Sequence, residues 1–335
     1  MMEYRILGKT GLEISRLGLG GIPIQRVDAE QTKALLHHLR AAGVNFVDTA
    51  RGYTVSEEYL GYALEGIRED FVIATKSMSR DAVSMAKDID ISLKNLRTDY
   101  IDLYQFHNPT PKDLDTIIAP GGALEALQAA KAAGKIRHIG ITAHYPEVFQ
   151  RALGLDWVET VMFPYNIIEN QGAEMIRQCK EKNIGFICMK PLAGGALDDG
   201  TLALRYIMQN DAVTVVIPGM AEEKEVQENV AAVQNSSPLT AEELEKIDTI
   251  RSTLGTQFCR RCNYCAPCTV GIPISAVLLF EGYLTRYGLG DWAKQRYETL
   301  AVKPEACVDC GICESRCPYQ LPIRDMLKKA ADLLR

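Results

Sequence analysis

The strongest constraint on the fold is a regular alternation of short apolar runs with segments of helical periodicity, over about the first 235 residues. Eight runs have the length and composition of strands, at residues 16–19, 45–48, 71–76, 101–106, 138–142, 160–163, 185–189 and 213–218. Candidate helices alternate with them at residues 29–42, 57–64, 81–96, 122–133, 146–153, 172–182, 202–209 and 222–233. Eight strand–helix units of this size predict an α/β fold of the (β/α)8 TIM-barrel type.

A doubly wound sheet is the alternative, but it usually has fewer repeats and a glycine-rich phosphate loop. The segment Gly18-Leu-Gly-Gly21 lacks the G-x-G-x-x-G spacing, and no helical segment follows it directly. We therefore interpret these glycines as a tight turn after the first strand.

Eight of the ten cysteines lie between residues 259 and 317, in two tight groups. The first group is Cys259, Cys262, Cys265 and Cys268, and the second is Cys307, Cys310, Cys313 and Cys317, followed by Pro318. The second group has the bacterial ferredoxin spacing C-x-x-C-x-x-C-x-x-x-C-P, in which the fourth cysteine binds the other cluster. This spacing predicts [4Fe-4S] clusters. By the crossed pairing, Cys317 would complete the cluster of the first group and Cys268 that of the second.

Other interpretations of the cysteines carry less weight. Zinc sites usually show two separated C-x-x-C pairs, and disulfides require an oxidising compartment. The first group departs from the ferredoxin run, with two residues before Cys268 and Thr269 in place of proline, so the number of clusters stays open between one and two. Cys179 and Cys188 lie in apolar-periodic segments and are interpreted as core residues.

The cysteines also define the domain organisation. We expect the barrel at residues 1–238, a connecting helix at 239–256 and a small, mostly helical, ferredoxin-like iron–sulfur module at 257–335. A chain of 335 residues is long enough for one large and one small domain. Thr240 and Glu243 form a capping-box pattern at the start of the connecting helix.

The overall composition limits the partners. The net charge of −6 and the isoelectric point near 5.5 argue against a nucleic-acid-binding role. No run of 18 apolar residues occurs, so no membrane span is expected, and the N-terminus lacks the apolar region of a signal peptide. Thiols together with clusters indicate a reducing cytoplasm.

Four polar residues lie at or just beyond the ends of three neighbouring predicted strands. Asp48 ends the second strand and Tyr53 follows it, Lys76 ends the third, and His107 follows the fourth. Because barrel chemistry takes place at the carboxyl ends of the strands, we expect these side chains to share one mouth. A phenol beside a lysine ammonium can give a proton to a carbonyl that receives hydride, since the cation stabilises the phenolate. Asp48 would hold Lys76 charged, and His107 would donate a hydrogen bond to the substrate oxygen.

The pattern Asp48-Thr-Ala-x-x-Tyr53-x-x-Ser56-Glu57, with Lys76 and His107, resembles the aldo/keto reductase family over roughly residues 4–235. The resemblance implies a nicotinamide cofactor, NAD(H) or NADP(H), and a small-molecule carbonyl substrate. It also implies that Tyr53 is the proton donor. Together with the cysteines, the segment Met189-Lys-Pro-Leu-Ala-Gly-Gly195 resembles the branch of the family with a ferredoxin-type extension.

The resemblance also implies cofactor contacts. Thr142 and Asn166 match positions that hold the nicotinamide carboxamide, and Lys190 is assigned to the cofactor as well. Gly219, Glu228 and Asn229 match positions that flank the adenosine end. The sequence departs from the family at Thr54, where glycine is usual, and at Glu225, where members that prefer NADP have arginine. A carboxylate at Glu225 favours NADH.

The combination of a hydride-transferring barrel with one-electron clusters leaves three functions open. The chain is either a carbonyl reductase with structural clusters, an electron-transfer protein that works with an external ferredoxin or flavoprotein, or a redox-sensing binding module. Direct transfer from nicotinamide to a cluster is chemically awkward, and the sequence has no flavin fingerprint.

Overall fold

The structure is a computed structural model that describes the backbone of residues 1–335 and every side chain except that of Thr256. The chain divides into two compact units. The first consists of Met1–Asn166, Asn170–Leu192 and Asp199–Leu239, and the second of Ile167–Glu169, Ala193–Asp198 and Thr240–Arg335.

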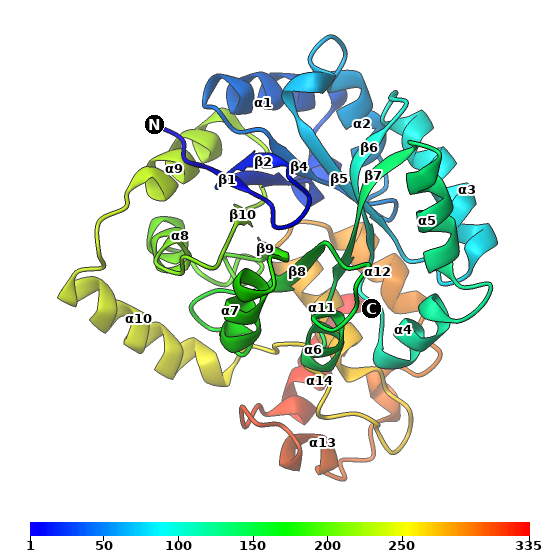
Figure 1. Cartoon of the computed structure of the whole chain (residues 1–335). Coiled ribbons are helices and arrows are strands. Elements are labelled where there is room, and N and C mark those ends of the chain that lie inside the picture. The colour runs from blue at the N-terminus through cyan, green and yellow to red at the C-terminus, as the bar shows by residue number, and fades with distance from the viewer. The chain divides into compact units, whose positions relative to one another are not determined.

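Eight parallel strands form the centre of the first unit, and its helices lie around them (Figure 1). The strands are β3 (Gly18–Gly20), β4 (Phe46–Asp48), β5 (Val72–Ser77), β6 (Ile101–Phe106), β7 (Ile136–Thr142), β8 (Thr160–Pro164), β9 (Gly185–Met189) and β10 (Val215–Ile217). Each strand pairs with the next along the chain. Parallel bridges from Leu17 to Val216 and from Gly20 to Gly219 close the sheet between β10 and β3. The predicted (β/α)8 barrel is therefore confirmed.

The predicted helices also form. They are α1 (Ala29–Ala41), α2 (Ser56–Ala63), α3 (Ala82–Asn95), α5 (Ala123–Ala132), α6 (Pro146–Ala152), α7 (Ala173–Glu181), α8 (Gly200–Met208) and α9 (Glu223–Gln234). Local sequence fixes several of their starts: Asp28 accepts the amide of Gln31 in a capping box of α1, and Asp81 caps α3. Apolar side chains from the outer faces of the strands and the inner faces of these helices make the main core, and a smaller cluster fills the barrel.

The smaller cluster includes two residues from a hairpin that the sequence did not predict. Strands β1 (Tyr4–Ile6) and β2 (Glu13–Ser15) pair antiparallel, and Leu7 and Ile14, both fully buried, pack in the cluster with Phe46 and Leu103. Helix α4 (Pro111–Ile118), which Thr110 caps, was not predicted either, and neither were the short 3-10 turns η1 (Ile22–Arg26) and η2 (Arg68–Asp70).

The interpretation of Gly18-Leu-Gly-Gly21 as a turn was wrong, because Gly18–Gly20 is strand β3 itself. The glycines are needed for close approach of the chain. A Cβ atom on Gly20 would lie 2.8 Å from the carbonyl oxygen of Ile217, and one on Gly18 would lie 2.8 Å from the ring of Phe46. The seam that closes the barrel therefore depends on residues without side chains.

The second unit is mostly helical. Its helices are α10 (Ala241–Thr253), α11 (Ile274–Thr285), α12 (Gly290–Glu298), α13 (Ile312–Ser315) and α14 (Ile323–Leu334), with 3-10 turns η3 (Leu254–Thr256) and η4 (Pro304–Ala306). Fully or nearly fully buried residues of α11, α12 and α14 form its core, among them Val277, Tyr297 and Leu327. Among the helices that the structure describes, none is long and apolar enough to cross a membrane.

Candidate functional site

A buried ion pair lies at the carboxyl ends of strands β4 and β5. The ammonium of Lys76 is 2.5 Å from a carboxylate oxygen of Asp48 and donates to the carbonyl oxygen of Thr49 at 2.8 Å. Lys76 is 2% exposed and Asp48 is 3% exposed. The amide of Gln105, in the neighbouring strand β6, donates to the other oxygen of Asp48 at 3.2 Å. Burial next to this carboxylate fixes the lysine in one position.

Burial and the attraction between the two charges act in opposite directions on the pKa values of Asp48 and Lys76. Burial raises the pKa of the Asp48 carboxyl and lowers the pKa of the Lys76 ammonium, because both charged forms lose contact with water. The attraction between the two charges acts in the opposite direction on each pKa. The charge on Lys76 therefore depends on Asp48.

Tyr53 and His107 lie beside this pair. The ammonium of Lys76 is 4.8 Å from the centre of the Tyr53 ring, and the rings of Tyr53 and His107 meet edge to face with their centres 5.9 Å apart. The amide of His107 donates to the carbonyl oxygen of Ser77, the last residue of β5, at 2.8 Å. The structure thus brings the four predicted residues Asp48, Tyr53, Lys76 and His107 together in the first unit, with Tyr53 and His107 only partly exposed.

The loop that carries Tyr53 is held by a buried carboxylate that the sequence analysis did not single out. Glu57, 1% exposed, accepts hydrogen bonds from the hydroxyls of Thr75 and Ser92, each at 2.8 Å, and pairs with the guanidinium of Arg51 at 2.9 Å. The amide of Arg51 donates to the carbonyl oxygen of Lys76 at 3.0 Å. The signal for Glu57 was present, since it belongs to the quoted motif, but a charged residue at the start of a helix is usually solvated.

Thr54, the departure from glycine after Tyr53, has a φ angle of 40°. This is the left-handed region that glycine adopts without strain, which gives a physical reason for glycine at this position. The Thr54 hydroxyl donates to the side-chain oxygen of Gln25 at 3.1 Å. The loop thus keeps this conformation with a β-branched residue.

Three candidate cofactor residues lie at or just beyond the ends of β7, β8 and β9. Thr142 is 1% exposed, and its hydroxyl oxygen accepts a hydrogen bond from the backbone N–H of Asn108 at 2.9 Å. Asn166, fully buried, donates from its side-chain amide to the carbonyl oxygen of Lys190 at 2.9 Å. Lys190 has a φ angle of 55°. Buried hydroxyl and amide groups at strand ends are the kind of donors and acceptors that fit a carboxamide ligand.

The other candidates follow β10. Gly219 pairs with Gly20 at the barrel seam. Glu228 and Asn229 lie on α9, where Glu228 is exposed and its carboxylate is 3.8 Å from the ammonium of Lys224. Glu225 caps this helix: its carboxylate accepts the amides of Ala221 at 2.6 Å and Glu222 at 3.3 Å. A negative charge thus occupies the helix N-terminus, where anions bind favourably.

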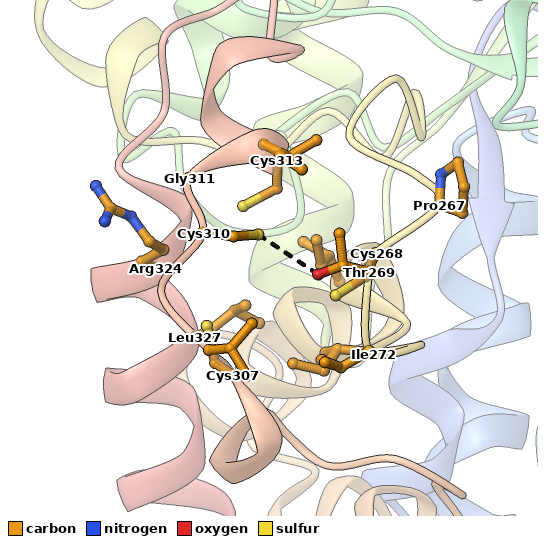
Figure 2. Close-up of a pocket in the computed structure, with 14 residues that line it drawn as sticks. Pro267, Cys268, Thr269, Ile272, Cys307, Cys310, Gly311, Cys313, Arg324 and Leu327 are labelled. Carbon is orange, nitrogen blue, oxygen red and sulfur yellow. Dashed lines mark hydrogen bonds between the residues drawn. The ribbon is translucent and has the colours of Figure 1, made fainter.

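In the second unit, four thiols line one cavity. Cys268, Cys307, Cys310 and Cys313 line one small pocket that is partly open to solvent, together with apolar residues, Thr269 and Arg324. Figure 2 shows Cys268 on one side of this space and Cys310 and Cys313 on the other, with Cys310 hydrogen-bonded to Thr269 at 3.4 Å. We refer to these four residues as the second cysteine set. They are the four that the crossed pairing assigns to one cluster.

The remaining four clustered cysteines interact electrostatically with one another. The thiol of Cys265 interacts with those of Cys259, Cys262 and Cys317, and Cys262 also interacts with Cys317. We refer to these four residues as the first cysteine set. Burial raises the pKa of the Cys265 thiol to about 12. This set is the other group of the crossed pairing.

No disulfide forms among the ten cysteines, whose side chains the structure describes, and Cys179 and Cys188 are fully buried core residues, as predicted. Among the described side chains, no three His, Cys, Asp or Glu residues are grouped as ligands of one metal ion. A cubane cluster differs from a single ion because each of its four thiolates binds a different iron. Its sulfurs therefore stand around a larger space, and four thiols around one cavity fit that requirement.

Comparisons with known proteins concern mainly the first unit. A sequence model of the aldo/keto reductase family matches residues 16–201 and 198–252. L-galactose dehydrogenase from Arabidopsis thaliana is 29% identical over 302 residues, which cover 74% of this chain and 94% of that protein. Aldo-keto reductase YhdN from Bacillus subtilis is 31% identical over 230 residues, which cover 63% of this chain and 68% of that protein. The holo structure of aldo-keto reductase AKR11C1 from Bacillus halodurans matches with a TM-score of 0.66 and 29% identity, and covers 75% of this chain and 96% of that one. The family match ends at residue 252, before Cys259.

The buried pair predicts a strong, pH-dependent effect of Asp48→Asn on stability. Near neutral pH the substitution leaves the Lys76 ammonium buried without its carboxylate, and the free energy of unfolding should fall by about 3–5 kcal/mol. Because the folded-state pKa of Lys76 is then further below its unfolded value, the unfolded chain binds more protons. The loss should therefore shrink as the pH rises toward about 10, as urea unfolding at several pH values would show.

The double variant Asp48→Asn/Lys76→Met is the matched control, because it removes both charges and should recover most of the lost stability. A single Asp48→Asn variant within about 1 kcal/mol of the wild type at every pH would contradict the ion pair.

Proposed function

The chain belongs to the aldo/keto reductase family and is an NAD(P)H-dependent oxidoreductase, and on this premise we propose that it reduces the carbonyl group of a small aldehyde or ketone to an alcohol. The observation that carries this proposal is the buried Lys76–Asp48 pair beside Tyr53 and His107. When bound, the nicotinamide cofactor supplies the hydride. The residues of the chain supply the proton and hold the substrate oxygen.

Tyr53 donates the proton. A phenol has an ordinary pKa of about 10 and is a weak acid near neutral pH. The charge of Lys76, 4.8 Å from the Tyr53 ring centre, stabilises the phenolate that remains, and Asp48 keeps that charge in place. His107 donates a hydrogen bond to the same substrate oxygen and stabilises its developing negative charge. Glu57 and Arg51 act through the loop that carries Tyr53.

The cofactor contacts are part of the same proposal. Thr142, Asn166 and Lys190 hold the nicotinamide end, and Gly219, Glu228 and Asn229 flank the adenosine end. The burial of Thr142 and Asn166 at adjacent strand ends supports the first assignment. The position of Gly219 and α9 directly after β10 supports the second.

Replacement of the proton donor tests the reductase. In Tyr53→Phe, kcat for a reactive aldehyde should fall by about 10²–10⁴-fold, because the donor proton is lost, while the Kd for NADH stays unchanged. Steady-state kinetics and quenching of protein fluorescence measure the two quantities. Tyr59→Phe removes a hydroxyl from the neighbouring helix α2 and should keep wild-type activity. Activity of Tyr53→Phe within tenfold of the wild type would refute the assignment.

We also propose that the enzyme prefers NADH, since the Glu225 carboxylate at the start of α9 repels a 2′-phosphate. Glu225→Gln should raise kcat/KM for NADPH relative to NADH about tenfold, which corresponds to roughly 1.4 kcal/mol of lost repulsion. Glutamine preserves the capping box, so the helix start is kept. A wild-type preference for NADPH of a hundredfold would contradict the proposal.

For the tail, we propose that residues 257–335 hold two [4Fe-4S] clusters with crossed ligands. The first cysteine set binds one cluster and the second set binds the other. The shared cavity of the second set and the mutual interactions of the first set support this division. The chemistry of the donors also fits, because four thiolates are the usual ligands of such clusters.

Single Cys→Ser variants test the pairing through the cluster that survives. In crossed ligation, Cys317→Ser and Cys259→Ser lose the same cluster and leave the same EPR signal in anaerobically prepared, dithionite-reduced protein. Cys268→Ser and Cys307→Ser leave the other signal, and each variant should hold about half of the wild-type iron and sulfide. If Cys317→Ser instead matches Cys307→Ser, the ligands are not crossed.

Exchange of electrons with an external ferredoxin or flavoprotein is the second candidate function. It is favoured by the exposure of Cys310 and of Val308, which is 61% exposed and adjoins Cys307. Under this alternative, NADH with a flavoprotein would bleach the cluster absorbance in Tyr53→Phe as it does in the wild type. A redox-sensing role would leave biological activity intact in the same variant.

A further inference from the structure

Two arginines lie between the first two cysteines of the tail, in the sequence Cys259-Arg260-Arg261-Cys262. Each is only 9% exposed. Buried guanidinium groups are costly unless something compensates their charge. The charges of the two arginines are compensated in different ways, and this difference determines the net charge beside the first cysteine set.

Arg261 is neutralised by a carboxylate. Its guanidinium is 2.7 Å from Glu169, which is fully buried. Glu169 belongs to the segment Ile167–Glu169 of the second unit. The pair of Arg261 and Glu169 therefore adds no net charge next to Cys259.

Arg260 is held by neutral groups. It donates to the carbonyl oxygens of Ile168 at 3.1 Å and Gly255 at 3.0 Å, and its guanidinium lies 3.6 Å from the centre of the Tyr319 ring. Among the described side chains, no carboxylate forms an ion pair with Arg260. The charge of Glu169 acts on its guanidinium without pairing with it, and Cys262 and Cys317 act on the guanidinium more weakly. Two buried cations and one buried carboxylate thus leave one net positive charge at the first set.

We propose that Arg260 sets the reduction potential of the first cysteine set, holding it above the value that burial alone would give. This inference rests on the proposed clusters. A site of four thiolates is anionic, and one added electron, here from a donor such as dithionite, makes it more so. Burial opposes that added charge, whereas a nearby cation in a medium of low dielectric favours it. Arg260 is a positioning and charge-setting residue, not a ligand.

The second set has a different environment. Arg324, whose side chain lines the pocket of this set, forms two hydrogen bonds with Glu314, at 2.8 and 3.0 Å, and is partly exposed. Glu314 also acts on the thiol of Cys313 as a negative charge. The cation beside the second set is thus neutralised and solvated, and Arg324 supplies a matched control for Arg260.

The test is a redox titration of the full-length, anaerobically prepared protein, followed by EPR, with iron and sulfide measured in every variant. Arg260→Gln should shift the potential of one signal downward, that of the first set as identified by the Cys259→Ser variant. Arg260→Lys keeps the charge but loses the planar set of N–H donors of the guanidinium. The first-set potential of this variant should stay close to that of the wild type. Equal shifts in the two variants would show that Arg260 acts only as an anchor, and would overturn the inference.

Two further variants fix the sign and the location of the effect. Glu169→Gln removes the compensating carboxylate and should shift the first-set potential upward, and this variant keeps the inference testable if Arg260→Gln does not fold. Arg324→Gln should leave the first-set potential unchanged. Two bound clusters with unshifted potentials in Arg260→Gln would refute the inference alone. A wild-type protein without iron would refute the proposed clusters as well.

Discussion

The parallel ladder that runs from β3 to β10 and closes back on β3 determines where the polar side chains of the barrel lie. Parallel strands start and end at the same edges, so residues that end neighbouring strands come together however far apart they are in sequence. Asp48 pairs in register with Ala74 of β5, and Lys76 pairs with Gln105 of β6. This register lets Lys76 reach Asp48 and lets Gln105 reach the same carboxylate. The closure itself depends on backbone contact at Gly20, where a side chain would separate β3 from β10.

Buried charged side chains follow the same rule in both units. A buried cation is fixed in place when a buried carboxylate faces it, as Asp48 faces Lys76 and Glu169 faces Arg261. Such pairs are held in one geometry. Arg260 is held instead by carbonyl oxygens and an aromatic ring and forms no ion pair among the described side chains, although the charge of Glu169 also acts on it.

The fold was largely predictable because hydrophobic periodicity reports burial directly. All eight predicted barrel strands form, with bounds within two residues of those observed. The hairpin of β1 and β2 was not predicted, because β2 contains one apolar residue and Tyr4 and Ile6 of β1 are exposed, and its buried Leu7 and Ile14 owe their place to tertiary packing. Gly18 and Gly20 were misread because their need for close approach becomes visible only once Phe46 and Ile217 are placed beside them.

The positions of Asp48, Lys76 and His107 followed from strand ends. Gln105 and Glu57 were not predicted as site residues, because their contribution depends on hydrogen-bond partners that are distant in sequence. Arg260 and Arg261 were missed because charged residues are usually exposed.

The proposed carbonyl reduction and the proposed clusters differ in the number of electrons that they transfer at once. Hydride transfer moves two electrons, and the barrel residues that we propose for it, Tyr53 with Lys76 and His107, need no one-electron step. An iron–sulfur site that only stabilises the fold also gains from a buried cation, because the cation reduces the cost of burying four thiolates. By the same Coulomb energy, however, that cation favours an added electron, so in the proposed cluster site Arg260 would both stabilise the thiolates and ease reduction. Scaffolding and electron transfer are therefore not exclusive at the first set. The second set differs, because Arg324 pairs with Glu314 and Cys310 is exposed, so that solvent reaches the Cys310 thiol directly.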